Sequence, residues 1–405
     1  MQAADTVFIL VSAAVVMFMT PGLALFYGGL TRSKNVLGTI MQSFCALGII
    51  TLLWFLLGYT LAFGADMGGI IGGLDYLGLK GVSSAPEPSL VSTIPHSLFM
   101  IFQCMFAVLT VALISGAYAE RMKFSSFLLF SVFWSILVYS PLCHWVWGGG
   151  WMDAIGALDF AGGAVVHMSS GSAALAAALV LGPRSGYGQR AFIPHNLPMT
   201  VTGASILWLG WFGFNAGSAL QADGIAVNAL VVTHAAASMG LLGWIAIEKL
   251  HRQKPTTLGA ASGAIAGLVA ITPAAGFVGP ISSLFIGFLA GVICYGGVLL
   301  KEKLHFDDSL DVVAIHGLGG IWGALATGIF ASTAINSGGA NGLLFGNPMQ
   351  LWIQFVSVLA ACVFSFVVSV LILKAVDKLI GLRVTPEEEE QGLDLSMHSE
   401  TGYKF

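Results

Sequence analysis

Charged residues are missing from long stretches of this chain, and this pattern constrains its fold more than any other feature. The nine uncharged intervals are 6–31, 35–65, 88–119, 124–152, 160–183, 191–222, 224–247, 255–300 and 312–373. An α-helix needs about 20 apolar residues to cross the roughly 30 Å hydrocarbon core of a bilayer. Only 9% of the 405 residues are charged, whereas a soluble domain carries about a quarter. The sequence therefore predicts a polytopic membrane protein.

The lengths of the intervals predict the number of crossings. Seven of the nine have room for one helix each, and the 46-residue and 62-residue intervals have room for two, separated at TPAAGFVGP and NSGGANGLLFGNP. This gives an all-α fold with eleven transmembrane helices. Because five is odd, helices 6–10 would enter the membrane from the side opposite to helices 1–5. The prediction is an inverted repeat followed by a long helix 11.

The basic residues predict the orientation. If the N-terminus lies outside, the inner loops, the last helix and the tail carry 15 of the 16 Lys and Arg residues, and only Lys80 lies outside. Positive residues concentrate on the cytoplasmic side of membrane proteins. We therefore expect a multi-pass protein of the cell membrane, with a transmembrane domain at residues 1–380 and a cytoplasmic tail at 381–405. The first five residues lack the basic region of a signal peptide.

Two Asp–x₇–His patterns, Asp159 with His167 and Asp308 with His316, lie in corresponding places of the two expected halves. A ring that can change its charge near neutral pH is expensive to keep in hydrocarbon. Each histidine lies about 12 Å along its helix from its aspartate, at about 1.5 Å per residue, so the pattern marks the repeat and is no catalytic dyad. Both rings are expected at middle depth, which suggests a path for a small proton-carrying solute.

Simpler readings of these residues stay open at this point. A lone histidine on an apolar face is more often a core residue than a functional one. Asp159 could cap the start of its helix, with or without an electrostatic contribution to a cation site.

Several classes of protein are disfavoured. The five cysteines show no CxxC spacing, so neither a disulfide framework nor a metal site is expected. The chain lacks HExxH and a rhomboid-type GxSG motif, so an intramembrane enzyme is not expected, and no cofactor is implied. The net charge of −4 gives no indication of nucleic-acid binding.

Six long motifs resemble the ammonium transporters of the Amt/Mep/Rh family, in particular the bacterial and archaeal Amt branch. They are HWVWGGGW (144–151), DFAGGAVVH (159–167), PHNLPM (194–199), GWFGFNAGSAL (210–220), SGAIAGLVAITPAAGF (262–277) and AIHGLGGIWG (314–323). The resemblance runs through all eleven expected helices and the tail. It implies ammonium or ammonia as substrate and a homotrimer in which each subunit has its own pore.

The resemblance also implies roles for individual residues. The family's twin pore histidines match His167 and His316, and its outer phenylalanine gate matches Phe106 and Phe214. The remaining matches are an outer cation site at Phe102, Trp147 and Ser218, a pore-lining tryptophan at Trp211 and an acidic supporting residue at Asp159.

The physical chemistry of these residue types agrees with that expectation. Aromatic rings attract a cation with about 0.5–2 kcal/mol, and a serine hydroxyl can accept an N–H bond that potassium cannot donate. An apolar pore would favour loss of the proton from ammonium, which the two histidines could pass on. Net ammonium transport and passage of ammonia alone both stay open.

Two further alternatives concern how the protein acts. It could be an ammonium sensor that signals through its tail and a separate partner, or a Rhesus-like passive gas channel. The tail GLRVTPEEEEQGLDLSMHSE (381–400) resembles the family's regulatory tail, which implies a possible PII signalling protein at the cytoplasmic face. A disordered acidic tail is the simpler alternative.

Overall fold

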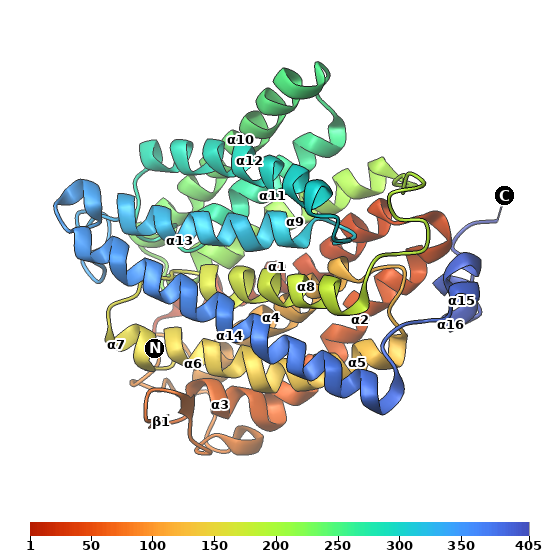
Figure 1. The fold of residues 1–405 in the computed structure, drawn as a ribbon. Helices are drawn as coiled ribbons and strands as arrows, with labels where there is room; N and C mark the ends of the chain where they lie inside the picture. Colours follow the sequence, from red (N-terminus) through yellow and green to blue (C-terminus); the bar gives the residue numbers. More distant parts are fainter. Residues whose placement is uncertain (405) are drawn as a thin grey trace.

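The computed structural model describes residues 1–404, which form a bundle of helices running side by side between two ends (Figure 1). Within these residues, ten helical segments are long and apolar enough to span a membrane: Ala3–Leu30, Ser33–Phe63, His96–Ala117, Phe124–Ala154, Gly163–Leu181, Leu197–Gly217, Gly224–Arg252, Pro280–Leu304, Val313–Phe330 and Pro348–Ile380. Where the sequence predicts the eighth crossing, the apolar helix Thr257–Ile271 has only 15 residues. The all-α membrane fold is confirmed, while the count of eleven spans stays a prediction.

Six of these segments are single long α-helices. They are α1 (Ala3–Leu30), α4 (His96–Ile114), α9 (Leu197–Gly217), α10 (Gly224–Arg252), α12 (Pro280–Leu304) and α14 (Pro348–Ile380), and the shorter α11 is Thr257–Ile271. The short elements outside the spans include the antiparallel strands β1 (Asp66–Met67) and β2 (Ile71–Gly72) and 3₁₀ turns at Leu77–Leu79 and Leu343–Phe345. The 3₁₀ turns Ser33–Asn35 and Ser115–Ala117 lie at the start of the second span and at the end of the third.

The other four spans each contain a π-helical turn. The turn Trp54–Gly58 joins α2 (Val36–Leu53) to α3 (Tyr59–Phe63), and Ser135–Tyr139 joins α5 (Phe124–Trp134) to α6 (Ser140–Trp147), which α7 (Trp151–Ala154) follows. The turn Gly163–Met168 precedes α8 (Ser169–Leu181), and Val313–Leu318 precedes α13 (Gly319–Phe330). The last two turns carry the two histidines of the Asp–x₇–His patterns. Such turns are rare in proteins, and those that do occur are often found at functional sites.

Glycines allow the closest helix contacts in the bundle. On α11, Gly263 and Gly267 face the backbone of α10 at Gly240, so that a methyl group at any of these positions would overlap the neighbouring helix. Small residues let membrane helices approach because no hydrophobic force drives their association inside a bilayer. The GxxxGxxxG spacing of residues 259–267 therefore has a packing role.

The two histidine helices cross in a reciprocal way. Gly171, four residues after His167, contacts the backbone of Gly317, while Gly320, four residues after His316, lies against His167. Going from residue 167 to residue 171 along the first helix, the contacts move from residue 320 back to residue 317 along the second, so the two helices run antiparallel. This arrangement is the one that an inverted repeat requires.

The C-terminal tail is folded against the ends of the membrane helices and is not a disordered acidic segment. It forms α15 (Pro386–Gln391), which begins with a capping box of Thr385 and Glu388, and α16 (Leu393–His398). Asp394 accepts hydrogen bonds from the backbone N–H groups of Leu37 (3.0 Å) and Gly38 (2.8 Å) at the N-terminus of α2. The two chain termini lie at opposite ends of the bundle (Figure 1).

Candidate functional site

His167 and His316 lie side by side in the interior. Their Nδ1 atoms are 3.2 Å apart, their rings are stacked with centroids 5.3 Å apart, and both residues are buried. A hydrogen bond between two imidazole nitrogens requires one ring to donate and the other to accept. The pair can therefore hold a proton between its two Nδ1 atoms. The Nε2 atom of His167 has no hydrogen-bond partner among the described residues.

The aspartates of the two Asp–x₇–His patterns fix the start of the turns that carry the histidines. The carboxylate of Asp159 accepts the N–H groups of Gly162 (2.9 Å), Gly163 (2.6 Å) and Ala164 (2.7 Å). Asp308 accepts the N–H of Val313 at 2.7 Å. In both halves the aspartate accepts a hydrogen bond from the N–H group five positions later, that of Ala164 or of Val313. Each aspartate thus acts on its histidine through the backbone, because a carboxylate stabilises the unpaired N–H groups of a helix N-terminus.

Two phenylalanines cover the histidine pair. The rings of Phe106, on α4, and Phe214, on α9, are stacked with centroids 4.2 Å apart, and both side chains are buried. The ring of Phe214 also lies 6.2 Å from that of His167. Trp211, one turn earlier on α9, stacks on His167 at 5.5 Å, and its indole N–H donates to the hydroxyl of Thr272 (2.9 Å).

A cavity of about 290 Å³ opens beyond the phenylalanine pair, on the side of the chain's N-terminus. Trp147 and Ser218 both line it, together with Gln103 and Asp153. Trp147 is held by its indole N–H, which donates to the backbone carbonyl of Asp159 at 2.9 Å, and its ring meets Phe106 edge-on at 5.9 Å. The hydroxyl of Ser218 donates to the carbonyl of Phe214 (2.8 Å), so its lone pairs are free to accept.

Two of the predicted site residues lie behind this cavity and do not line it. Phe102 is fully buried and packs edge-on against Phe106 at 5.0 Å, because the absence of a side chain at Gly217 leaves room for its ring. The carboxylate of Asp159 faces the backbone of the following turn. Burial raises the pKa of this carboxyl, an effect that its backbone hydrogen bonds oppose.

Comparison with known proteins decides the family. A sequence profile described as Ammonium Transporter Family matches residues 7–403. The chain belongs to the ammonium transporter family. It is 56% identical over 405 residues to an ammonium transporter of Bacillus subtilis (strain 168), covering 100% of this chain and 99% of that protein.

Solved structures of this family share the fold. The crystal structure of Saccharomyces cerevisiae Mep2 gives a TM-score of 0.89 at 37% identity and covers 95% of this chain and 91% of that one. A structure described as a sensor Amt protein gives 0.90 at 29% identity and covers 98% of both chains. The chain is therefore a multi-pass membrane protein, and its Bacillus subtilis relative is named as an ammonium transporter.

The opposite end of this family member holds a buried ion network. Arg184 contacts Asp307 (2.8 Å) and Glu120 (2.9 Å), and Glu120 also contacts Arg32 (3.1 Å). Burial alone would raise the pKa of Glu120, but Arg184 and Arg32 hold it below its usual value. Next to this network, burial raises the pKa of Asp308 to about 6.

Sequence reasoning missed two polar groups near the histidine pair and the cavity beside Trp147. Gln103 lines the cavity beside Trp147 and Ser218, and its buried Oε1 has no partner among the described residues. Thr272 orients Trp211. A lone amide in the apolar segment FQCMF was a usable signal for Gln103, since an amide buried in a membrane helix needs a partner. The threonine gave no such signal, because a hydroxyl in a helix can bond its own backbone, as Thr272 also does to Leu268.

Proposed function

We propose that this protein moves ammonium or ammonia across the cell membrane along the line of rings from Trp147 through Phe106 and Phe214 to His167 and His316. The observation that carries the proposal is the contact between the two buried histidines, 3.2 Å between Nδ1 atoms, directly behind the stacked phenylalanines. Two titratable rings in a membrane interior cost free energy, and here each of them is carried by a π-helical turn.

The outer cavity suits a small cation that can donate hydrogen bonds. The face of Trp147 offers cation–π attraction of about 0.5–2 kcal/mol, and the oxygens of Ser218 and Gln103 can accept N–H bonds. Potassium has a similar size but donates no hydrogen bond, so it would recover less of its lost hydration. Phe102 supports this site from a second layer by fixing the ring of Phe106.

Beyond the phenylalanine pair the surroundings favour ammonia over ammonium. A bare cation among buried apolar groups pays a large desolvation cost, so ammonium would release its proton before it passes Phe106 and Phe214. The histidine pair can accept a proton at one ring and release it from the other through the shared Nδ1 contact. Trp211 covers His167 and limits the space for water beside the rings.

The test is current recording on solid-supported membranes with the purified protein in liposomes. An ammonium-evoked current is expected, and His167→Asn or His316→Asn should abolish it. His305→Asn is the matched control, because His305 is exposed and has a backbone φ of +56° that asparagine tolerates. Ammonia flux without current would contradict the proton-coupled version and favour a Rhesus-like gas channel.

The setting of the protein follows the same proposal. We place the N-terminus outside and residues 381–405 in the cytoplasm. Supporting this orientation, Arg32, Arg184 and Arg383 gather at the end where the tail docks, as the positive-inside rule expects. Residues 1–380 would form the transport domain and the tail a regulatory one. A homotrimer, and a PII protein binding at the cytoplasmic face, remain proposals that native mass spectrometry of the purified protein would test.

A sensor is the second candidate function. Its support is the likeness to the structure described as a sensor Amt protein, with a TM-score of 0.90. In that case ammonium would bind tightly at Trp147 and Ser218, and the signal would reach a separate partner through the tail. Binding measured by calorimetry, with neither flux nor current in liposomes, would favour the sensor over the transporter.

A further inference from the structure

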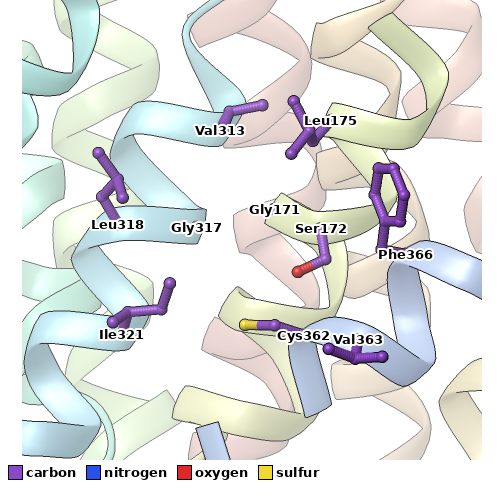
Figure 2. A pocket seen from close by; sticks show the side chains of 10 residues that line it. All are labelled: Gly171, Ser172, Leu175, Val313, Gly317, Leu318, Ile321, Cys362, Val363 and Phe366. Carbon is purple, nitrogen blue, oxygen red and sulfur yellow. The ribbon is translucent and has the colours of Figure 1, made fainter. Parts of the chain in front are cut away.

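A second cavity lies on the outside of the histidine crossing, between three membrane-spanning helices. Its volume is about 310 Å³, and its walls come from α8, from the π turn and first residues of α13, and from α14 (Figure 2). Leu175, Ile321 and Phe366 point into it from these three helices, and the glycines Gly171 and Gly317 form its floor. None of these side chains takes part in the proposed transport path.

The cavity opens toward the membrane rather than toward either aqueous end. Val363, on its rim, is 52% exposed and belongs to a stripe on α14 with Leu359 (55%), Val367 (47%) and Leu371 (62%). Residues four apart share one face of a helix. A bulky aliphatic stripe in the middle of a membrane helix is suited to contact with lipid chains, whereas tight contacts between membrane helices use small residues.

The lining is unsuited to water as an occupant. Apart from backbone atoms, the polar groups on its walls are the hydroxyl of Ser172 and the thiol of Cys362, and a thiol is only a weak hydrogen-bond partner. A buried water needs about two to four polar partners, and apolar cavities that lack them stay dry. A cavity of about 150 Å³ holds a benzene molecule, so this one has room for a longer alkyl segment.

We propose that this cavity is a binding site for one acyl chain of a membrane lipid. The chain would enter past Val363 and lie against Phe366 and Leu175, with its end near the two glycines. Gly317 directly follows His316, and Gly171 and Gly317, which both line the cavity, are in contact with each other at the histidine crossing. The bound chain therefore supports the π turn that carries His316 from its outer side. This inference does not depend on what passes between the histidines.

The test is electron cryo-microscopy of the full chain in nanodiscs of phosphatidylcholine with brominated acyl chains. We expect elongated density with bromine peaks between Leu175, Ile321 and Phe366. The variant Cys362→Phe places an aromatic ring in the cavity and should reduce this density to noise. Val367→Phe adds the same ring on the exposed face of α14 outside the lining, so its cavity density should equal that of the unchanged protein.

Three outcomes would overturn the proposal. One is an empty cavity in the unchanged protein while lipid is ordered elsewhere on the helices. The second is occupation of the cavity by side chains of a second copy, which would make it a subunit contact. The third is density that stays the same in Cys362→Phe. Since the unchanged protein already gives a decisive result, poor folding of a variant does not leave the proposal untested.

Discussion

At the scale of single residues, Asp159 illustrates how one buried carboxylate can position a histidine without touching its ring. Its two oxygens accept backbone N–H groups of the turn that leads to His167. Removing a capping side chain of this kind costs about 0.5–2 kcal/mol. We expect Asp159→Ala to lower the thermal unfolding temperature of the detergent-purified protein and to reduce transport together with it, because the His167 turn loses its anchor.

Asp159→Asn separates capping from electrostatics. The amide keeps one acceptor oxygen but has no charge, so a capping role predicts a smaller loss of stability than in Asp159→Ala, with transport following stability. The opposite pattern, full stability with no current, would mean that the negative charge itself attracts the cation in the outer cavity.

Asp308 and Glu120 affect the free energy of unfolding in opposite directions as the pH rises, because the pKa of Asp308 is raised and that of Glu120 is lowered. Burial raises the pKa of Asp308 from 3.8 to about 6, and its Oδ1 has no partner among the described residues. A carboxyl with a raised pKa in the folded state holds its proton more tightly there than in the unfolded chain. The free energy of unfolding therefore falls as the pH rises from about 4 to about 6. The full cost corresponds to about 3 kcal/mol above pH 6, as an order of magnitude.

Asp308→Asn should remove this cost, since the amide oxygen can still accept from Val313. We expect the difference in unfolding temperature, variant minus unchanged protein, to rise between pH 4 and pH 7. Glu302→Gln, at an exposed carboxyl, should show no such trend. A difference that stays constant with pH would show that Asp308 does not titrate in this range.

At the scale of elements, the sequence predicted the two histidine helices and their antiparallel order correctly, and it predicted that the aspartates are not paired with the rings. The π turns were out of reach, because a π turn uses the same residues as an α-helix and differs only in the register of its hydrogen bonds. The place of Phe102 behind Phe106 was equally hidden, since it depends on the space left by Gly217 on another helix.

The helix crossing itself can be tested at Gly171. A methyl group there would collide with the backbone of Gly317, and backbone cannot move aside as a flexible side chain can. We expect Gly171→Ala to push the two helices apart, to lengthen the contact between His167 and His316, and to reduce the ammonium-evoked current at least tenfold. The current is recorded on solid-supported membranes at matched protein density.

Gly48→Ala is the matched control for this substitution. Gly48 is an exposed helical glycine of α2 with no atom within 4 Å of its added Cβ, and alanine is the better helix former by about 1 kcal/mol. Its current should stay unchanged and its stability should stay equal or rise. An undiminished current in Gly171→Ala would mean that conduction tolerates a looser histidine pair.

At the scale of the whole molecule, a continuous set of polar contacts connects the tail to the end of the bundle. The N–H of Leu393 donates to Asn35 (2.8 Å), whose amide donates to Glu120 (3.0 Å), and Glu120 contacts Arg184. Arg383 and Ser185 both bond to Glu389. The tail is thus bound to groups that also fix the C-terminal end of α8, through Arg184, and the loop before the His316 turn, through Asp307.

Asp394 is the residue whose loss should release this tail. It supplies the acceptors for the free N–H groups at the start of α2, so Asp394→Ala leaves Leu37 and Gly38 without partners and removes a favourable charge from a helix N-terminus. We expect faster amide hydrogen exchange across residues 385–398 than in the unchanged protein, with little change in the membrane helices. Glu400→Ala, at an exposed position of the same tail, should exchange like the unchanged protein.

The variants Asp394→Ala and Glu400→Ala also test whether the state of the tail changes the ammonium-evoked current. If the contacts from Leu393 through Asn35 and Glu120 to Arg184 transmit the state of the tail, the current of Asp394→Ala should differ from that of Glu400→Ala, because the loop before His316 is held by Asp307 on Arg184. A tail that exchanges faster while the current stays equal would contradict this coupling. The tail would then be a docking surface for a partner and not a part of the conduction machinery.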